Sequence, residues 1–215
     1  MESLVRGGTR WRRFAVVMVP SVAATAAIGV ALAQGALAAS FAVSGQEFKV
    51  HADTLNGRGF VQYGNVDVQH GKKGAVPVAV SAFKSATITG LCQSVVVPAP
   101  IIGDVTLRLT AGNNGKKVQA SNLYIDLNQL NADATFYDIN IGVAAGDTDP
   151  SYAVPEPSVA KDEDHGGASS FAQEAKSAVL KNVNQTAWAT SAGTFKLAGL
   201  SMSVKKGSGS GVECY

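Results

Sequence analysis

The sequence predicts an all-β domain that follows an N-terminal apolar helix. Three observations support this prediction. After residue 39, apolar residues alternate with polar ones over most of the chain; short segments rich in Gly and Asn separate the alternating runs; and one phrase recurs along the chain. A period of two is typical of strands with one buried face. At 215 residues, a single compact domain is the default expectation.

The N-terminal segment has the composition of an export signal. Four arginines, the last of them Arg13, precede the uncharged run FAVVMVPSVAATAAIGVALA at 14–33, and the next charged residue is Glu47. As a helix, this run is long enough to cross a hydrocarbon core of about 30 Å. A small-x-small pattern ends at Ala38, which predicts cleavage between Ala38 and Ala39.

An uncleaved segment is the alternative, because the apolar run is longer than most signal cores. Residues 1–38 are therefore expected to be a signal peptide or an N-terminal membrane anchor. Residues 39–215 are expected to form one β-rich extracytoplasmic domain, because the basic flank stays on the cytoplasmic side. The domain is then secreted, or held at the cell membrane by its N-terminal segment.

The two cysteines fit an oxidising compartment. Cys92 and Cys214 form an even pair, and a bond between them would hold down a C-terminal tail that contains the flexible run GSGSG at 207–211. Because the bond would close a loop of about 120 residues, the chain-entropy description gives about 4 to 5 kcal/mol. Two free thiols are the alternative.

Alternation predicts the strands in order, and Gly and Asn predict the turns between them. Turns are expected at 56–57, 71–74 and 113–115. The segment FAQEAKSAVLKN at 171–182 tolerates a helix by composition, but its place in the repeat described next favours a strand. The alternating runs lie at 66–68, 76–80, 105–109, 123–127 and 137–141.

The recurring phrase is KSATITGLCQS at 84–94 and KSAVLKNVNQT at 176–186. Ala86 of the first copy stands 34 residues from Ala52 in VHADTL and from Ala120 in VQASNL, whereas Ala178 of the second copy is displaced by a poorly patterned segment. This spacing predicts four strand–turn–strand units with a flexible insertion at about 145–169. Four such units would form a barrel, a half-pipe or a sandwich.

Charge argues against a nucleic-acid partner. The 18 basic and 16 acidic side chains fall to 14 and 15 once the four leader arginines and Glu2 are set aside. A phosphate-binding groove needs clustered cations interleaved with aromatic residues, and the remaining chain has no such cluster.

The sequence identifies no catalytic, cofactor-binding or metal-binding residues. An acyl hydrolase would need His51 or His70 close to Ser44, Ser81 or Ser94, and the chain has no GxSxG elbow. Both histidines are expected on exposed positions. The acidic run at 162–165, with Asp147 and Asp149 upstream, matches no calcium-loop spacing and is expected to be a solvated loop.

Several segments together resemble a family of exported actinobacterial (Streptomyces-type) proteins of unknown function. They are FAVSGQEFKVHADTLNGRGFVQY, the LCQSV around Cys92, NLYIDLNQLNADATFYDINIG, NQTAWATSAGTFKLAGL and the terminal ECY. The resemblance implies a β-rich envelope domain behind an apolar segment. Some members carry the automatically assigned name cholesterol esterase, and such genes often lie beside a gene for a small multi-span membrane protein.

The leading functional hypothesis is a non-enzymatic envelope protein that binds a lipid-like ligand or an integral membrane protein partner, without a cofactor. An open half-pipe would present the necessary apolar trough, whereas a closed sheet would bury it. The alternatives are an extracellular lipid or sterol esterase, and a structural surface module that assembles through sheet edges.

Overall fold

The structure is a computed structural model and describes residues 46–68, 75–153 and 168–215. These residues confirm the all-β prediction: they form seven strands and a single 3₁₀ turn, η1 (Ala145–Asp147). The segment 171–182 lies in a strand, as its place in the repeat predicted. The strands are β1 (Phe48–Val68), β2 (Ala75–Thr89), β3 (Leu91–Ala99), β4 (Gly103–Ala111), β5 (Val118–Ala144), β6 (Phe171–Lys196) and β7 (Ser201–Lys206).

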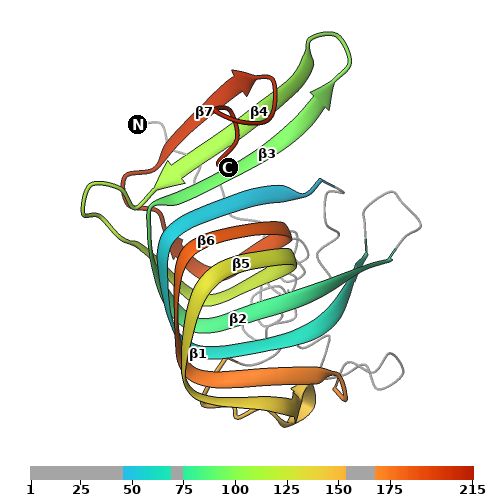
Figure 1. The fold of residues 1–215 in the computed structure, drawn as a ribbon, viewed down its shortest axis with the longest axis vertical. Coiled ribbons are helices and arrows are strands. Elements are labelled where there is room, and N and C mark those ends of the chain that lie inside the picture. Colours follow the sequence, from blue (N-terminus) through green and yellow to red (C-terminus); the bar gives the residue numbers. More distant parts are fainter. Residues whose placement is uncertain (1–45, 69–74, 154–167) are drawn as a thin grey trace, which may run out of the picture. The chain divides into compact units, whose positions relative to one another are not determined.

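All seven strands belong to one antiparallel sheet in the order β2-β5-β6-β1-β3-β4-β7, with a further pairing of β2 with β1. The strands β1, β2, β5 and β6 therefore pair in a circuit, and Figure 1 shows them curling back on themselves. Within the described residues, β5 pairs only with β6 beyond Leu127. The curled sheet is consequently not a clear barrel, which was one of the three forms expected.

A row of irregular positions crosses the curled sheet where the long strands bend. Gly59 in β1 (φ 63°) lies opposite Lys84 of β2 and Lys176 of β6, and both pairs are missing from the register of these strands. The row continues with Asn122 (φ 47°) and Asp138 (φ 52°), both in β5. Gly, Asn and Asp tolerate positive φ best, so the sequence places them where the ladder must kink. We call this line of residues the bend row.

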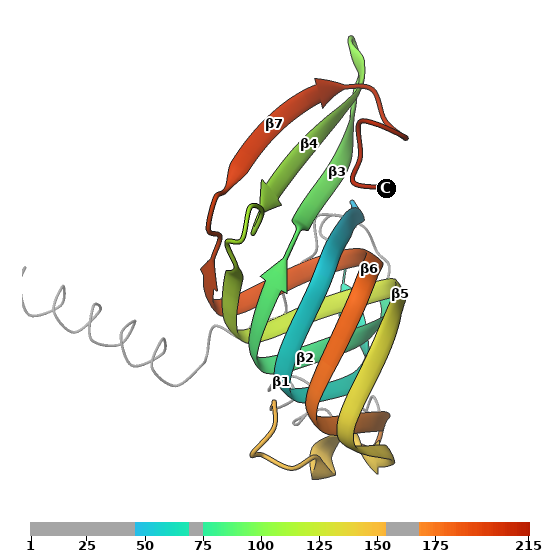
Figure 2. The ribbon, with the colours of Figure 1, turned by 60° about the vertical axis from the view of Figure 1, so that its left-hand side comes forward.

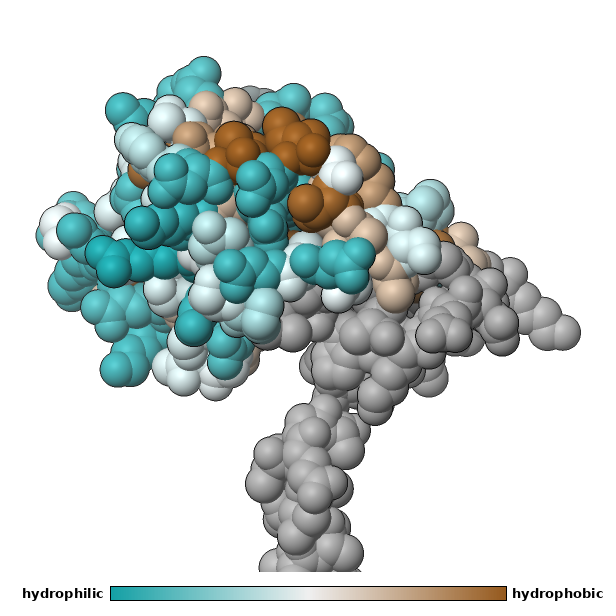
Figure 3. Space-filling view, turned by 90° about the horizontal axis from the view of Figure 1, so that it is seen from below, coloured by the Kyte–Doolittle hydropathy of each residue, from teal (hydrophilic) through white to brown (hydrophobic). Residues whose placement is uncertain are grey.

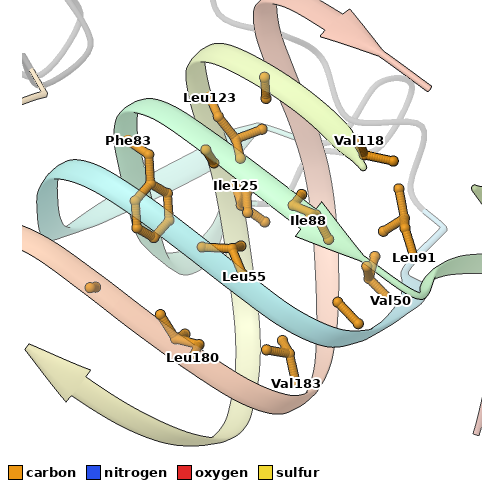
Figure 4. Close-up of a cluster of buried hydrophobic side chains, with 14 of the residues drawn as sticks. Val50, Leu55, Phe83, Ile88, Leu91, Val118, Leu123, Ile125, Leu180 and Val183 are labelled. Atoms are coloured by element: carbon orange, nitrogen blue, oxygen red, sulfur yellow. The ribbon is translucent and has the colours of Figure 1, made fainter. Parts of the chain in front are cut away.

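The hydrophobic core lies inside the curl. Figure 4 shows Leu55, Phe83 and Ile125 pointing toward one another from β1, β2 and β5. The ring of Phe60 packs against Phe83 and Phe136, with centroid distances of 5.3 and 5.1 Å. Each large side chain buried in this way contributes about 1.5 to 3 kcal/mol, so the core supplies much of the driving force for folding.

A second, smaller cluster covers part of the outward face of the curl. Val61, Tyr63 and Val80 are buried there with Ala153, which follows β5 in the chain. The backbone N–H of Ala153 donates to the carbonyl of Gly59 at 2.9 Å. Residues 145–153, the start of the segment predicted as a flexible insertion, are thus packed against the sheet. Residues 154–167 of that segment lie outside the described residues.

The strands β3, β4 and β7 extend the sheet beyond the curl (Figures 1 and 2). This extension joins the rest of the sheet through β1, where Phe48 to His51 pair with Val95 to Cys92. Figure 2 shows β7, β4 and β3 side by side, followed by β1, β6 and β5. Among the described strands of the curl, the extension therefore pairs with β1 alone.

The structure corrects one predicted turn and explains the repeated phrase. Residues 56–57 were expected to turn, but they lie within β1, where Gly57 pairs with Ala86 on one side and with Ala178 on the other. The two copies of Lys-Ser-Ala thus flank the same segment of β1. Ala52, which the spacing grouped with these alanines, lies outside this row and pairs with Val183.

The leader lies outside the described residues, as does its predicted cleavage site between Ala38 and Ala39. Across 46–68, 75–153 and 168–215, no helix has both the length and the hydropathy needed to span a membrane.

Candidate functional site

The predicted disulfide is present and fastens the C-terminal tail to β3. Cys92 and Cys214 are bonded, and the backbone N–H of Cys214 donates to the Ser94 hydroxyl at 3.1 Å. The Thr106 hydroxyl of β4 donates to the carbonyl of Gly207 at 2.6 Å. These contacts place the tail over Cys92, Ser94 and Thr106, which are buried, whereas Asp104 and Ser203 on the same face stay exposed.

An ion pair anchors the tail to β1. The Lys49 ammonium lies 2.8 Å from a carboxylate oxygen of Glu213 and 5.3 Å from the centre of the Tyr215 ring. The hydrogen bond from Lys49 is the main cause that lowers the pKa of Glu213 below its ordinary value. The tail is therefore held by covalent, ionic and hydrogen-bonding contacts.

The opposite face of the extension is apolar and exposed. Residues directly opposite one another in an antiparallel pair share a face, and Leu107 pairs with both Val95 and Val204. Met202 and Val204 of β7 are 71% and 67% exposed. Leu109, at the end of this face next to the curl, packs against the core, whereas Val97 and Leu107 are exposed like Met202 and Val204. We call it the apolar face; its members are Val95, Val97, Val105, Leu107, Leu109, Met202 and Val204.

The hairpin between β3 and β4 ends in an exposed apolar tip. The nine residues from Val95 to Gly103 carry no charge or polar side chain. Ile101 is 97% exposed and Ile102 is more than half exposed. Two adjacent isoleucines at a protruding turn are costly in water, so this tip joins the apolar face as a candidate contact surface.

Among the described residues, the hollows inside the curl are small. A cavity of about 190 Å³ is lined by Leu55, Phe83 and Phe136, with Gln62 and Gln185 among its polar contributors. Ligand pockets usually measure about 300 to 1,000 Å³. The open apolar trough considered from the sequence is thus largely filled by side chains, and the exposed apolar surface lies on the extension instead.

The residues considered for an esterase do not come together where the structure describes them. Nδ1 of His51 lies 2.7 Å from the Asn184 side-chain oxygen, and Nε2 lies 3.5 Å from the Asp53 carboxylate. The Ser81 hydroxyl accepts a hydrogen bond from Gln62, and Ser94 accepts one from the tail, as described above. Ser44 and His70 lie outside the described residues.

Asp149, which lies upstream of the acidic run, serves local structure. The Asp149 carboxylate accepts a hydrogen bond from the backbone N–H of Ser151 at 2.8 Å, which lowers the pKa of Asp149. The backbone N–H of Asp149 in turn donates to Glu174 at 2.7 Å. The run at 162–165 lies outside the described residues.

A polar groove, which sequence reasoning missed, crosses the outward face of the curl. Its volume is about 710 Å³, and its floor is the backbone of Gly57, Ala86, Ala120 and Ala178, since Gly57 has no side chain and the three alanine methyl groups point inward. The outward neighbours of these residues line the groove. Five carry hydroxyls (Ser85, Thr87, Ser121, Ser177 and Thr194), two carry amides (Asn56 and Gln119), and two are cations (Arg58 and Lys196). The sequence did contain a signal for this groove, the repeated Lys-Ser-Ala phrase, because the Ser and Ala of both copies line it.

The fold and these surfaces define an all-β protein whose disulfide indicates an oxidising environment outside the cytoplasm. The chain belongs to the DUF6230 family, described as a family of unknown function, which it matches over residues 44–215. This match confirms that the resemblance seen in the sequence is to a family of unknown function. No curated protein and no solved structure matches the chain.

Proposed function

We propose that this chain is a non-catalytic extracytoplasmic protein that associates with lipid membranes through its apolar face and hairpin tip. The observation that carries the proposal is the exposure of Met202 and Val204 on the apolar face together with that of Ile101 at the hairpin tip. On a soluble domain, an exposed surface of this kind marks an interaction site. The esterase alternative has no comparable support, because His51 is engaged by Asn184 and Asp53.

The shape of this surface favours a bilayer over a small lipid-like ligand. A small ligand is held in a concave pocket, whereas Ile101 and Ile102 stand at the end of a protruding hairpin. Transferring one such side chain from water into hydrocarbon is worth about 1.5 to 3 kcal/mol. The two isoleucines are thus suited to enter the acyl boundary of a membrane.

Charge on the extension supports the same partner. Of the cations on β3, β4 and β7, Arg108 and Lys205 lie on the face that bears the tail, together with the carboxylate of Asp104, whereas Lys206 lies on the other face. Lys206 pairs with Val105 and so lies on the apolar face. Each cation near an anionic membrane surface contributes about 1 kcal/mol. Besides this surface, the chain has the uncharged run at 14–33, which is long enough to span a membrane. We include membrane anchoring by this run in the same proposal.

The test is partition of the full chain into vesicles of phosphatidylcholine with one-third phosphatidylglycerol. Replacing Ile101 and Ile102 together with serine is expected to weaken binding at least tenfold, because both side chains lose their transfer free energy. The matched control is Phe171→Ser, which removes a 64% exposed aromatic residue at the start of β6. Since both variants keep the N-terminal segment, any difference between them belongs to the β-domain.

The control also probes a rival surface. The end of β5 and the start of β6 lie at the bottom of Figure 1, and a view from that side shows a hydrophobic patch (Figure 3). If Phe171→Ser weakened vesicle binding while the double isoleucine variant did not, the assignment to the hairpin tip would be wrong. If neither variant changed binding, the β-domain would not contact lipid, and an integral membrane protein partner would replace this proposal.

A further inference from the structure

We propose that the polar groove on the outward face of the curl binds an extended acidic polysaccharide chain. The groove is lined by residues of β1, β2, β5 and β6 alone, so it is separate from the strands of the apolar face. The proposal is therefore independent of membrane association.

The direction of the groove suits an extended chain. Arg58 pairs with Ser177 on one side and with Ser85 on the other, and Ser85 pairs with Ser121. Paired residues share a face, and neighbouring strands lie about 4.8 Å apart, so the outward side chains form a regular line across the strands. A polymer laid along this line meets one polar side chain on each strand it crosses.

The chemistry of the lining suits a hydroxyl-rich ligand. Hydroxyl and amide side chains both donate and accept hydrogen bonds, and seven of the fourteen lining residues are of these two kinds. Sugar hydroxyls likewise donate and accept. Val179 is the largest apolar residue in the lining, so the groove offers an aliphatic ligand little surface to contact.

Charge restricts the ligand to an anionic one. Arg58 and Lys196 are in the lining, and no carboxylate is among the lining residues of the described chain. Arg58 is exposed and lies at the centre of the line of serines, and its guanidinium binds a carboxylate in a bidentate manner. Lys176, in the adjacent bend row, is partly offset by Asp138 at 3.8 Å.

An aromatic residue stands at one end of the same line. Tyr137 of β5 pairs with Ser177, so it shares the outward face, and its side chain is 53% exposed. An exposed tyrosine ring presents an apolar face next to a hydroxyl, the combination that a sugar ring can stack on. The line thus runs from an aromatic platform through Arg58 to the hydroxyls of β2 and β5.

The test measures binding of polygalacturonate oligomers to the full, disulfide-bonded chain by isothermal titration at low salt. Saturable binding is expected, and Arg58→Gln is expected to weaken it at least tenfold, because a charge-assisted hydrogen bond is lost. Lys117→Gln removes one positive charge from the exposed turn between β4 and β5 and is the matched control, expected to leave binding unchanged. Thr87→Val keeps the shape of the side chain and removes its hydroxyl, with an expected loss of about two- to fivefold.

Two further probes separate recognition from charge alone. Dextran offers hydroxyls without charge, and poly-L-glutamate offers carboxylates without sugar hydroxyls; both are expected to bind at least tenfold more weakly than polygalacturonate. Equal binding of poly-L-glutamate would overturn the proposal, because attraction between opposite charges would then suffice. Equal losses in Arg58→Gln and Lys117→Gln would overturn it as well, and so would a failure of polygalacturonate to bind.

Discussion

Gly57 is the residue on which the close packing of the curl depends most directly. It lies in the middle of β1, and a Cβ at this position would overlap the ring of Phe83, which is itself buried in the core. The absent side chain therefore makes room for a large aromatic side chain from the neighbouring strand. The same residue also forms part of the groove floor.

Replacing Gly57 with alanine is expected to destabilise the domain by about 1 to 3 kcal/mol, because Phe83 or the backbone must move to accept the added methyl group. Urea unfolding followed by tryptophan fluorescence measures this change. Gly64→Ala is the control: Gly64 is exposed in the same strand, and an added Cβ there meets nothing within 4 Å. Equal effects of the two substitutions would show that backbone entropy, and not overlap with Phe83, decides the result.

The bend row shows what alternation in a sequence can and cannot predict. Gly57 and Phe60 both face inward although they are three residues apart, because Gly59 between them adopts a positive φ and shifts the alternation. A strict period of two would have placed one of them outside. The individual alternating runs were therefore predictable, whereas the change of face between them depends on a local kink.

At the scale of strands, the sequence predicted the composition of the elements better than their lengths. All five alternating runs lie in strands, but β5 and β6 reach 27 and 26 residues because both continue through the bend row. A glycine that suggested a turn at 56–57 instead packs under Phe83. Which residues lie opposite one another across the sheet depends on pairing between distant segments, and for this reason the polar groove was not predicted.

The candidate sites were predictable to different degrees for similar reasons. The cysteines predicted their own bond because only one pairing exists in a chain with two of them. The apolar tip has a signal in the sequence, because the run from Val95 to Gly103 contains neither a charged nor a polar side chain. The apolar face had none, since alternation shows that a strand has an apolar side but not whether another segment covers it.

The C-terminal tail is bonded to β3, and we expect the disulfide to contribute most of the stability that the tail gives to the domain. The bond closes a loop across a sequence separation of 122, for which the chain-entropy description gives about 4 to 5 kcal/mol. Replacing Cys92 and Cys214 together with serine is expected to lower the free energy of unfolding by about this amount. Urea unfolding under non-reducing conditions measures the difference.

The ion pair between Lys49 and Glu213, which also holds the tail, provides a control for that measurement. Glu213→Gln removes only the charge that faces Lys49, a pair that is accessible from the surface on the lysine side, and is expected to cost less than about 1 kcal/mol. If the double serine variant lost no more stability than Glu213→Gln, the loop constraint would be unimportant, and the tail would be held by its local contacts alone.

The whole domain combines two regions that differ in how much of their surface is buried. The curl has a core enclosed by four long strands, whereas the extension of β3, β4 and β7 has one face that the tail covers in part and an apolar face that is exposed over most of its members. Only the pairing of 48–51 with 92–95, together with the tail, joins the extension to β1. Regions with fewer buried contacts open at a lower free energy than the rest of a protein.

Native-state hydrogen exchange of the double serine variant is therefore expected to show β4 opening before β6. The two strands are well matched, because β4 lies between β3 and β7 just as β6 lies between β1 and β5, so each has hydrogen-bonding neighbours on both sides. Amides of β4 should exchange at least tenfold faster than those of β6, and their exchange should depend less on added denaturant, because a partial opening exposes less surface.

Vesicles that bind the apolar face should slow exchange in β4 and leave β6 unchanged, since a ligand stabilises only the region whose opening releases it. Equal exchange in the two strands at every denaturant concentration would mean that the domain unfolds as one unit, and that the exposed face of the extension costs it no local stability.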